Sequence, residues 1–170
     1  MSARSYVSQL GQLETPYYFY DMQLLHDTLT KAVSEASKYG YKIHYALKAN
    51  FDPRIVSAAL QAGLGVDCVS GNEVRTAIES GCPASKIVFA GVAKSDREIH
   101  YALEQNIFAF NCESLQELQV INALAAEMGR TAHVALRINP DVDPHTHKNI
   151  STGHADSKFG ISYTEIDEAI

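Results

Sequence analysis

The sequence predicts an α/β fold built around a parallel β-sheet. Strand-like and helix-like segments alternate at intervals of about 20–25 residues, and parallel strands need helical crossovers of this kind. A (β/α)8 barrel and a doubly wound sheet both fit this alternation, but no GxGxxG loop follows the first strand, which disfavours a dinucleotide-binding fold. Three strand-to-helix junctions repeat the helix-start motif Ser-x-x-Glu: Ser70 with Glu73, Ser95 with Glu98, and Ser114 with Glu117.

The first elements are predicted from their apolar spacing and their boundaries. Residues 22–39 have helical apolar spacing and stop at Gly40, a residue type that commonly ends helices. The run 43–47 predicts a strand, and residues 53–63 predict a helix because a proline opens it and a glycine closes it. The apolar run 64–70 predicts the second strand.

The later elements follow the same order, with serine at the start of each repeating helix. They are a helix at 72–81, a strand at 86–91, a helix at 96–105, a strand at 107–112, a helix at 115–129 and a strand at 131–140. A loop is predicted to continue to about Tyr163, and a last helix to begin near Thr164. A (β/α)8 barrel closes with eight strands, so we expect residues 22–170 to form the truncated N-terminal part of such a barrel within a larger protein.

Composition and charge exclude several classes of function. The formal net charge of −6 argues against binding to nucleic acid or to anionic membranes. The longest apolar runs are far shorter than the roughly 20 residues of a membrane helix, and the N-terminus lacks the apolar core of a signal peptide. Cys68, Cys82 and Cys112 are widely spaced, which predicts reduced thiols in a cytoplasmic protein rather than disulfides or a zinc site.

Strand alternation predicts which polar side chains gather at one end of the barrel. Lys48, Asp67 and Arg137 fall on the face opposite the apolar positions of their strands, at or near the carboxyl ends where barrel enzymes carry out their chemistry. A lysine in such a place is a natural imine-forming amine. A structural ion-pair layer explains Asp67 and Arg137 equally well, and helix capping alone accounts for Glu73.

Several motifs resemble the alanine-racemase-like, fold-type III pyridoxal-phosphate decarboxylases, a family that includes the ornithine, arginine and diaminopimelate decarboxylases. The lysine motif is Tyr45-Ala46-Leu47-Lys48-Ala49-Asn50, followed by Ile55-Val56 and Gly63. The second, third and fifth strand segments are similar to Val66-Asp67-Cys68-Val69-Ser70-Gly71-Asn72-Glu73, Phe89-Ala90-Gly91 with Lys94-Ser95, and Leu136-Arg137-Ile138-Asn139-Pro140. The resemblance covers nearly the whole chain.

The loop 139–161 resembles the version found in the diaminopimelate-specific members. It carries His147, Ile150, Thr152 and Gly153, and then Lys158-Phe159-Gly160-Ile161. The resemblance implies a substrate loop that contains His147, Thr152, Gly153 and Lys158. A metal pair formed by His145 and His147 is the alternative, but spacing suggests no third ligand, so we expect no metal.

The resemblance implies pyridoxal 5'-phosphate as the cofactor and decarboxylation of meso-2,6-diaminopimelate to L-lysine and CO2. Lys48 would hold the cofactor through a Schiff base, and Asp67 and Arg137 would line the cofactor site. The segment 1–21, with its aromatic run 17–20, would be an early strand associated with a second, β-rich domain absent here. The resemblance also implies a cytoplasmic enzyme that is a homodimer when full length, with no nucleic-acid or membrane partner.

The resemblance also implies that part of the active site lies outside the 170 residues. The family's phosphate loop, its acidic partner for the pyridine nitrogen and its catalytic cysteine would all lie in later segments, so the 170 residues alone are expected to be inactive.

The sequence leaves several alternative functions open. Arginine or ornithine decarboxylation is the alternative within the family. Two further alternatives are a homologue of these decarboxylases that binds pyridoxal phosphate without catalysis, and a Schiff-base aldolase that uses Lys48 without pyridoxal.

Overall fold

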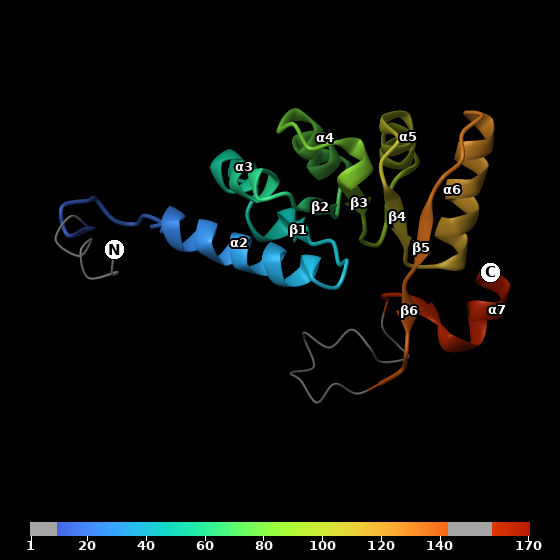
Figure 1. Ribbon diagram of the computed structural model, residues 1–170. Coiled ribbons are helices and arrows are strands. Elements are labelled where there is room, and N and C mark those ends of the chain that lie inside the picture. The colour runs from blue at the N-terminus through green and yellow to red at the C-terminus, as the bar shows by residue number, and fades with distance from the viewer. Residues whose placement is uncertain (1–9, 143–157) are drawn as a thin grey trace.

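A computed structural model describes residues 10–142 and 158–170 of the chain (Figure 1). The elements alternate as the sequence predicts. In chain order they are α2 (Met22–Ser37), β1 (His44–Ala46), the 3₁₀ helix η2 (Leu47–Ala49), α3 (Pro53–Gln61), β2 (Gly65–Cys68), α4 (Gly71–Glu79), the 3₁₀ helix η3 (Ala84–Lys86), β3 (Ile87–Phe89), α5 (Asp96–Gln105), β4 (Ala109–Cys112), α6 (Leu115–Glu127), β5 (Val134–Leu136), β6 (Ile138–Asn139), β7 (Ile161–Ser162), the 3₁₀ helix η4 (Tyr163–Glu165) and α7 (Ile166–Ala169).

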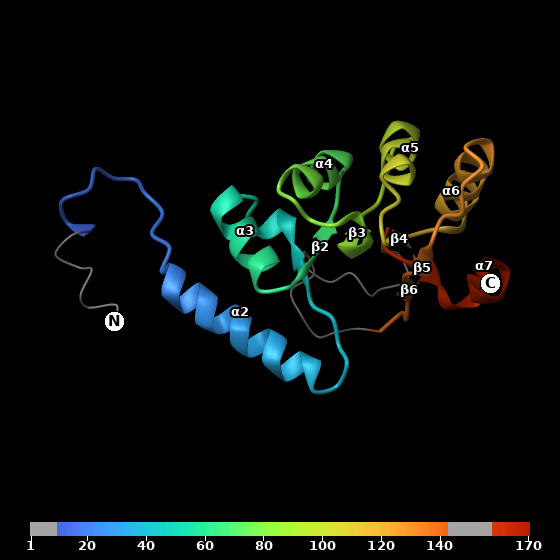
Figure 2. The same ribbon diagram turned by 45° about the horizontal axis from the view of Figure 1, so that its top comes forward.

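The main sheet has its strands in chain order, and this order decides between the two predicted architectures. All neighbouring strands from β1 to β5 pair in parallel in the order β1-β2-β3-β4-β5. Helices α3 to α6 lie along one side of this sheet (Figures 1 and 2). A doubly wound sheet carries helices on both faces, whereas a barrel carries them only outside. The prediction of the N-terminal part of a (β/α)8 barrel is confirmed.

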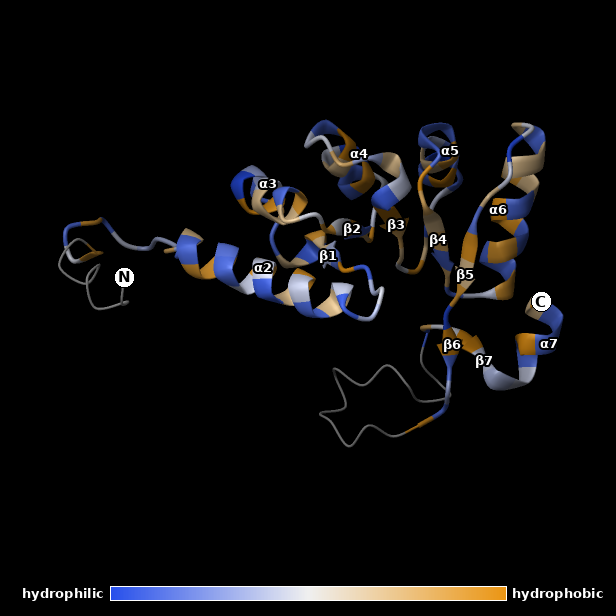
Figure 3. Cartoon of the chain, in the orientation of Figure 1, coloured by the Kyte–Doolittle hydropathy of each residue, from blue (hydrophilic) through white to orange (hydrophobic). Residues whose placement is uncertain are grey.

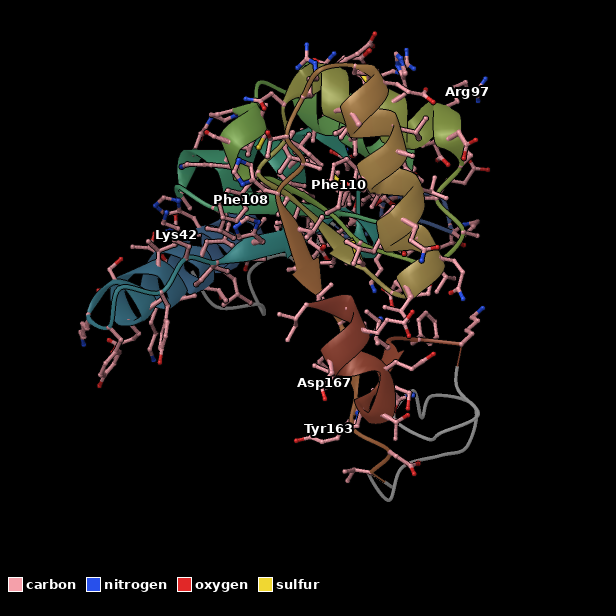
Figure 4. The ribbon with its side chains drawn as sticks, turned by 90° about the vertical axis from the view of Figure 1, so that its right-hand side faces the viewer. Lys42, Arg97, Phe108, Phe110, Tyr163 and Asp167 are labelled. Carbon is pink, nitrogen blue, oxygen red and sulfur yellow. The ribbon has the colours of Figure 1, made fainter. Side chains whose placement is uncertain are left out.

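The core lies between the sheet and these helices. Alternate strand residues such as Val66, Cys68, Phe89 and Phe110 are almost fully buried there. The apolar stripes of the helices turn toward the strands (Figure 3), and Phe110 lies within the molecule while exposed side chains such as Arg97 lie at its edge (Figure 4). The other set of strand residues therefore faces the interior of the barrel, as the alternation predicts.

Serine caps begin α4 and α6, as predicted. The hydroxyls of Ser70 and Ser114 accept hydrogen bonds from the backbone N–H groups of Glu73 and Glu117, each at 3.2 Å. The two glutamate carboxylates do not return the bond to the serine N–H as in a capping box. They accept instead from the residue before each serine, which for Glu73 is Val69 at 2.8 Å. Glu73 is a capping residue, and its carboxylate fixes the turn after β2.

All five predicted strands are shorter in the structure, and two of them also continue differently from the prediction. The strand predicted at 43–47 ends at Ala46, and the chain continues as the 3₁₀ helix Leu47–Ala49. The strand predicted at 131–140 divides into β5, which pairs with β4, and β6, which pairs in parallel with β7. Apolar alternation continues through both places, so only the available backbone partners decide where each strand ends.

The aromatic run near the N-terminus forms no strand. Residues 17–20 are extended and exposed, and in the described part of the chain they pair with no sheet. Tyr20 is joined to the loop after η2, because the Asn50 side-chain amide donates to the Tyr20 hydroxyl at 2.9 Å. Association of the segment 1–21 with a second domain stays a prediction. Within the described ranges, no helix is long and apolar enough to cross a bilayer.

Candidate active site

A cavity of about 650 Å³ lies at the carboxyl ends of the strands, on the sheet face opposite the helices. Its size is typical of a site for a cofactor or small ligand. Residues from every strand of the main sheet or from the loops that follow the strands contribute to it. The lining residues are Lys48, Asp67, Val69, Ala90, Gly91, Val92, Asn111, Glu113, Ala135, Leu136, Arg137 and Phe159. The structure thus brings together the three residues that the sequence predicts for a cofactor site.

Lys48 lies in η2, directly after β1, and its side chain lines the cavity. The sequence predicts Lys48 at the end of the first strand, whereas in the structure it is exposed and belongs to the 3₁₀ turn that follows the strand. Because this turn follows the last residue of β1, the Lys48 side chain lies beyond the strand and lines the open cavity. Lys48 makes no ion pair or hydrogen bond with any side chain that the structure describes, so its amine is available to a ligand.

Asp67 lies on the second strand, β2, next to the end of β1 that precedes Lys48. Its partner in the parallel register is Ala46, two residues before the lysine. Burial raises the pKa of Asp67 above its usual value, and the positive charges of Lys48 and His44 lower it by a smaller amount. Asp67 is therefore a half-buried carboxyl group that holds its proton more tightly than an exposed aspartate does.

Arg137 follows β5 and pairs with Glu113, a residue that the sequence interpretation missed. The Arg137 Nη1 atom donates to both carboxylate oxygens of Glu113, at 3.1 and 3.0 Å. The sequence allows an ion pair of Arg137 with Asp67, but the observed partner is Glu113. The sequence contains a signal for Glu113, since it directly follows β4 and lies two residues after Asn111, which continues the alternation on the cavity side.

Residues 159–161 pack against the chain that follows the fifth strand. The Ile161 N–H donates to the Arg137 carbonyl at 2.7 Å, and Gly160, at φ +82°, lies so close that an added Cβ would be 3.0 Å from the Asn139 nitrogen. This close approach places the ring of Phe159 against Arg137, with the guanidinium carbon 4.8 Å from the ring centroid. Phe159 and Glu113 together define the position of Arg137.

A buried cation, Lys94, supports the loop after β3. The Lys94 side chain is 1% exposed, pairs with Glu117, and donates to the carbonyls of Gly91 and Asn111 at 2.7 and 2.9 Å. The loop contains two residues in the left-handed region, Gly91 at φ +93° and Ala93 at φ +62°. Lys94 therefore holds an otherwise unfavourable backbone conformation at the edge of the cavity.

The predicted substrate loop is only partly covered by the structure. His147, Thr152 and Gly153 lie outside the described residues. Lys158 is described and exposed, with its ammonium 5.3 Å from the Phe159 ring centroid, and it lines a neighbouring pocket rather than the main cavity. The described ranges contain no cluster of three or more His, Cys, Asp or Glu side chains suited to a metal ion.

The three cysteines are free and buried. Burial raises the pKa of all three thiols, to about 11 for Cys112 and further for Cys68. They lie on the core side of the sheet or at its edge and contribute nothing to the lining of the cavity.

The cavity combines a primary amine, two carboxyl groups and a guanidinium at the carboxyl edge of a parallel sheet. The amine can condense with an aldehyde, the carboxyl group beside it can exchange a proton with it, and the guanidinium can bind an anionic oxygen. This set of groups fits an aldehyde cofactor that carries anionic substituents.

Known proteins similar to this chain carry names consistent with that chemistry. The sequence profile described as "Pyridoxal-dependent decarboxylase, pyridoxal binding domain" matches residues 25–170. A diaminopimelate decarboxylase of Bacteroides thetaiotaomicron is 52% identical over 96% of this chain and 43% of its own length. One from Zymomonas mobilis is 46% identical over 89% of this chain and 37% of its own length.

A solved structure agrees with these sequence relatives. The diaminopimelate decarboxylase of Helicobacter pylori complexed with L-lysine superposes with a TM-score of 0.87 at 38% identity, covering 96% of this chain and 42% of that one. The chain thus spans less than half the length of the relatives it matches. On the profile match over residues 25–170, the chain belongs to the pyridoxal-dependent decarboxylase family, in the part that binds pyridoxal.

Proposed function

We propose that this chain is the pyridoxal-binding part of a diaminopimelate decarboxylase, which converts meso-2,6-diaminopimelate to L-lysine and CO2. The observation that carries the proposal is the placement of Lys48, Asp67 and Arg137 around one cavity. The substrate class is supported by the 52% and 46% identity to diaminopimelate decarboxylases. It is supported also by the L-lysine complex of the Helicobacter pylori relative, because lysine is the expected product.

The residues of the cavity fit pyridoxal phosphate. The Lys48 amine reaches an open space of about 650 Å³, large enough for the cofactor together with an amino acid. Gly91, at φ +93°, allows the loops after β2 and β3 to pack closely at the wall of that space, because a Cβ there would lie 3.3 Å from the Val69 carbonyl oxygen. Lys48, Asp67 and Arg137 are the residues that would hold the cofactor.

When bound, pyridoxal phosphate supplies an aldehyde that condenses with amines and a ring that accepts the electron pair left as CO2 departs. Lys48 Nζ supplies the amine that anchors the cofactor. Asp67 accepts or returns a proton at Lys48 Nζ, and burial, which raises the pKa of Asp67, favours the protonated form of this carboxyl group. Arg137 supplies a fixed positive charge for an anionic oxygen on the other side of the cavity.

Further features are part of the same proposal. Residues 147–158 would contribute the substrate loop, with His147, Thr152, Gly153 and Lys158 facing the substrate. The full-length protein would be a cytoplasmic homodimer, in keeping with its free cysteines. The segment 1–21 would belong with a second domain, and 22–170 with the barrel.

Product analysis of the full-length protein tests the proposal. The purified enzyme with pyridoxal phosphate is offered meso-2,6-diaminopimelate, L-ornithine or L-arginine, and the released CO2 and amine products are measured. Lysine formed from diaminopimelate at a rate at least a hundredfold above the other two is the expected result. The matched control is Lys48→Ala, which removes the amine and should abolish turnover.

Each alternative gives a different outcome in the same assay. Faster turnover of ornithine or arginine identifies a decarboxylase of another specificity. Cofactor absorbance without release of CO2 identifies a pyridoxal-binding homologue without catalysis. A protein that lacks visible cofactor absorbance and acts on carbonyl substrates identifies the Schiff-base aldolase.

A further inference from the structure

Glu113 is a buried acid in the wall of the cavity to which the mechanism above gives no task. Its side chain is 3% exposed, at the carboxyl end of β4 and directly before the cap of α6. An acid in such a place is costly unless it is paired and hydrogen-bonded. Its partners therefore indicate what it does.

The Glu113 carboxylate joins two loops of the cavity wall. It accepts two hydrogen bonds from Arg137 Nη1, after β5, and one from the Gly91 N–H, after β3, at 3.3 Å. All three residues line the cavity. The carboxylate thus connects three successive strand ends at the place where a ligand would sit.

The backbone of Glu113 is itself fixed. Its N–H donates to the Glu117 carboxylate at 2.9 Å, and that carboxylate pairs with the buried ammonium of Lys94. Lys94 in turn holds the carbonyl of Gly91. Glu113 is therefore attached to a rigid frame on its helix side and presents its carboxylate to the cavity side.

The two side chains of this ion pair differ in burial. This difference allows a role of Glu113 in orienting Arg137 to be distinguished from a role in stability. The Arg137 side chain is 41% exposed, so water can solvate the guanidinium if the carboxylate is removed. Both hydrogen bonds use Nη1, and the described residues provide no acceptor for Nη2. Glu113 and the Phe159 ring contact the guanidinium from two different segments of the chain, and Arg137 itself lines the cavity.

We propose that Glu113 is a positioning residue that orients the Arg137 guanidinium toward an anionic oxygen of the ligand in the cavity. This rests on the proposed function, in which Arg137 faces the cofactor or the substrate. The oxygen belongs either to the cofactor or to a carboxylate of the amino-acid substrate, and both present the same chemistry to a guanidinium.

A double-mutant cycle in the full-length protein tests this role. The variants are Glu113→Gln, Arg137→Lys and the two together, with Glu79→Gln on the exposed face of α4 as the matched control. Gln keeps the volume of Glu113 and can still accept from Gly91, whereas Lys keeps the charge of Arg137 without its planar fork. Four quantities are measured: the Kd of the apoprotein for pyridoxal phosphate, the KM and kcat for the amino-acid substrate, and the Tm of the apoprotein.

We expect Glu113→Gln to raise Kd or KM at least fivefold while Tm stays within a few degrees of the wild-type value. The double variant should be no more than twofold worse than Arg137→Lys alone, because Glu113 acts through Arg137. A change in Kd assigns the anionic oxygen to the cofactor, and a change in KM alone assigns it to the substrate. Glu79→Gln should change none of these values.

Three outcomes overturn the proposal. Multiplicative effects of the two substitutions would mean that Glu113 acts independently of Arg137. Unchanged Kd and KM would mean that it positions nothing, and loss of the folded protein in Glu113→Gln would make its role structural. Should the full-length protein not use diaminopimelate, the proposed function fails; the role of Glu113 is then decided by the cofactor Kd together with the KM for the amino acid that the protein does use.

Discussion

Glu113 and Arg137 form an ion pair in which only the acid is buried. Their closest atoms, Oε2 and Nη1, lie 3.0 Å apart, yet the glutamate side chain is 3% exposed and the arginine side chain 41% exposed. The carboxylate depends on the guanidinium for its neutralisation, whereas the guanidinium can turn to water. Substitution of Arg137 should therefore cost stability as well as ligand binding, whereas Glu113→Gln should weaken binding with little change in stability.

Replacement of Arg137 by methionine should destabilise the protein. The substitution leaves the buried Glu113 carboxylate without its cation, and we expect a loss of about 1–3 kcal/mol in the free energy of unfolding. Urea unfolding of the full-length protein measures it. Adding Glu113→Gln should recover at least half of the loss, and Arg54→Met, which breaks an exposed pair with Asp52, is the control with little effect. An Arg137→Met protein as stable as the wild type would contradict the prediction.

Lys48 should be the residue that carries the cofactor. Borohydride reduction of the full-length holoenzyme, followed by peptide mapping, is expected to place the pyridoxyl group on the Lys48 peptide. Lys94 is already bound to three acceptors and is 1% exposed, and Lys42 lines a pocket near the amino ends of the strands. A label on either of these lysines would refute the assignment. Lys48→Ala should lose nearly all turnover but keep its fold, because Lys48 is exposed.

Lys94 should matter for stability rather than for chemistry. Lys94→Met leaves the Glu117 carboxylate and two backbone carbonyls without their donor in a buried place, so we expect a loss of about 3–5 kcal/mol. Lys86→Met is the matched control, because exposed Lys86 makes one hydrogen bond, to the Gly63 carbonyl. Chemical denaturation compares the free energies of unfolding of the two variants. Equal losses would show that the buried Lys94–Glu117 pair contributes no more to stability than the exposed hydrogen bond of Lys86.

Asp67 should make the protein less stable as the pH rises. Its pKa is raised by burial, so the folded state binds the proton more tightly than the unfolded state does. Stability should therefore fall as the pH rises from the usual aspartate pKa through the raised value, and the cost is fully present above it. Asp67→Asn should raise the Tm of the apoprotein at pH 7 and change it little at pH 3.5. A Tm lowered by Asp67→Asn at pH 7 would contradict this sign.

The three cysteines should be inert in the folded protein. Burial raises the pKa of Cys112 to about 11 and that of Cys68 further, so little thiolate exists at pH 8, and the side chains are inaccessible. A thiol-reactive chromophore should label them at least a hundredfold faster in 6 M guanidinium than in buffer. A Ser37→Cys variant on the exposed part of α2 is the control, since its added thiol should react at once. Rapid labelling of the native wild type would contradict the placement of these residues.

The sequence by itself determined the order of the elements and the starts of the helices. Ser70 and Ser114 cap α4 and α6 where predicted, because the hydrogen bonds involved join residues three positions apart. Alternation along each strand likewise separated Asp67 from its buried neighbours Val66 and Cys68. Such choices depend on near neighbours in the chain, so a single sequence contains them.

The tertiary structure alone decided how the cavity is assembled. Glu113 meets Arg137 across 24 positions of sequence, and Lys94 meets Glu117 across 23. These pairs depend on the register of β3, β4 and β5, in which a shift of one residue turns a side chain to the other face. The end of β1 before Lys48 was likewise set by backbone pairing, because its apolar pattern continues past the last residue that has a partner in β2. Local sequence names the residue types of the site, and only the pairing of distant strands determines which of them meet.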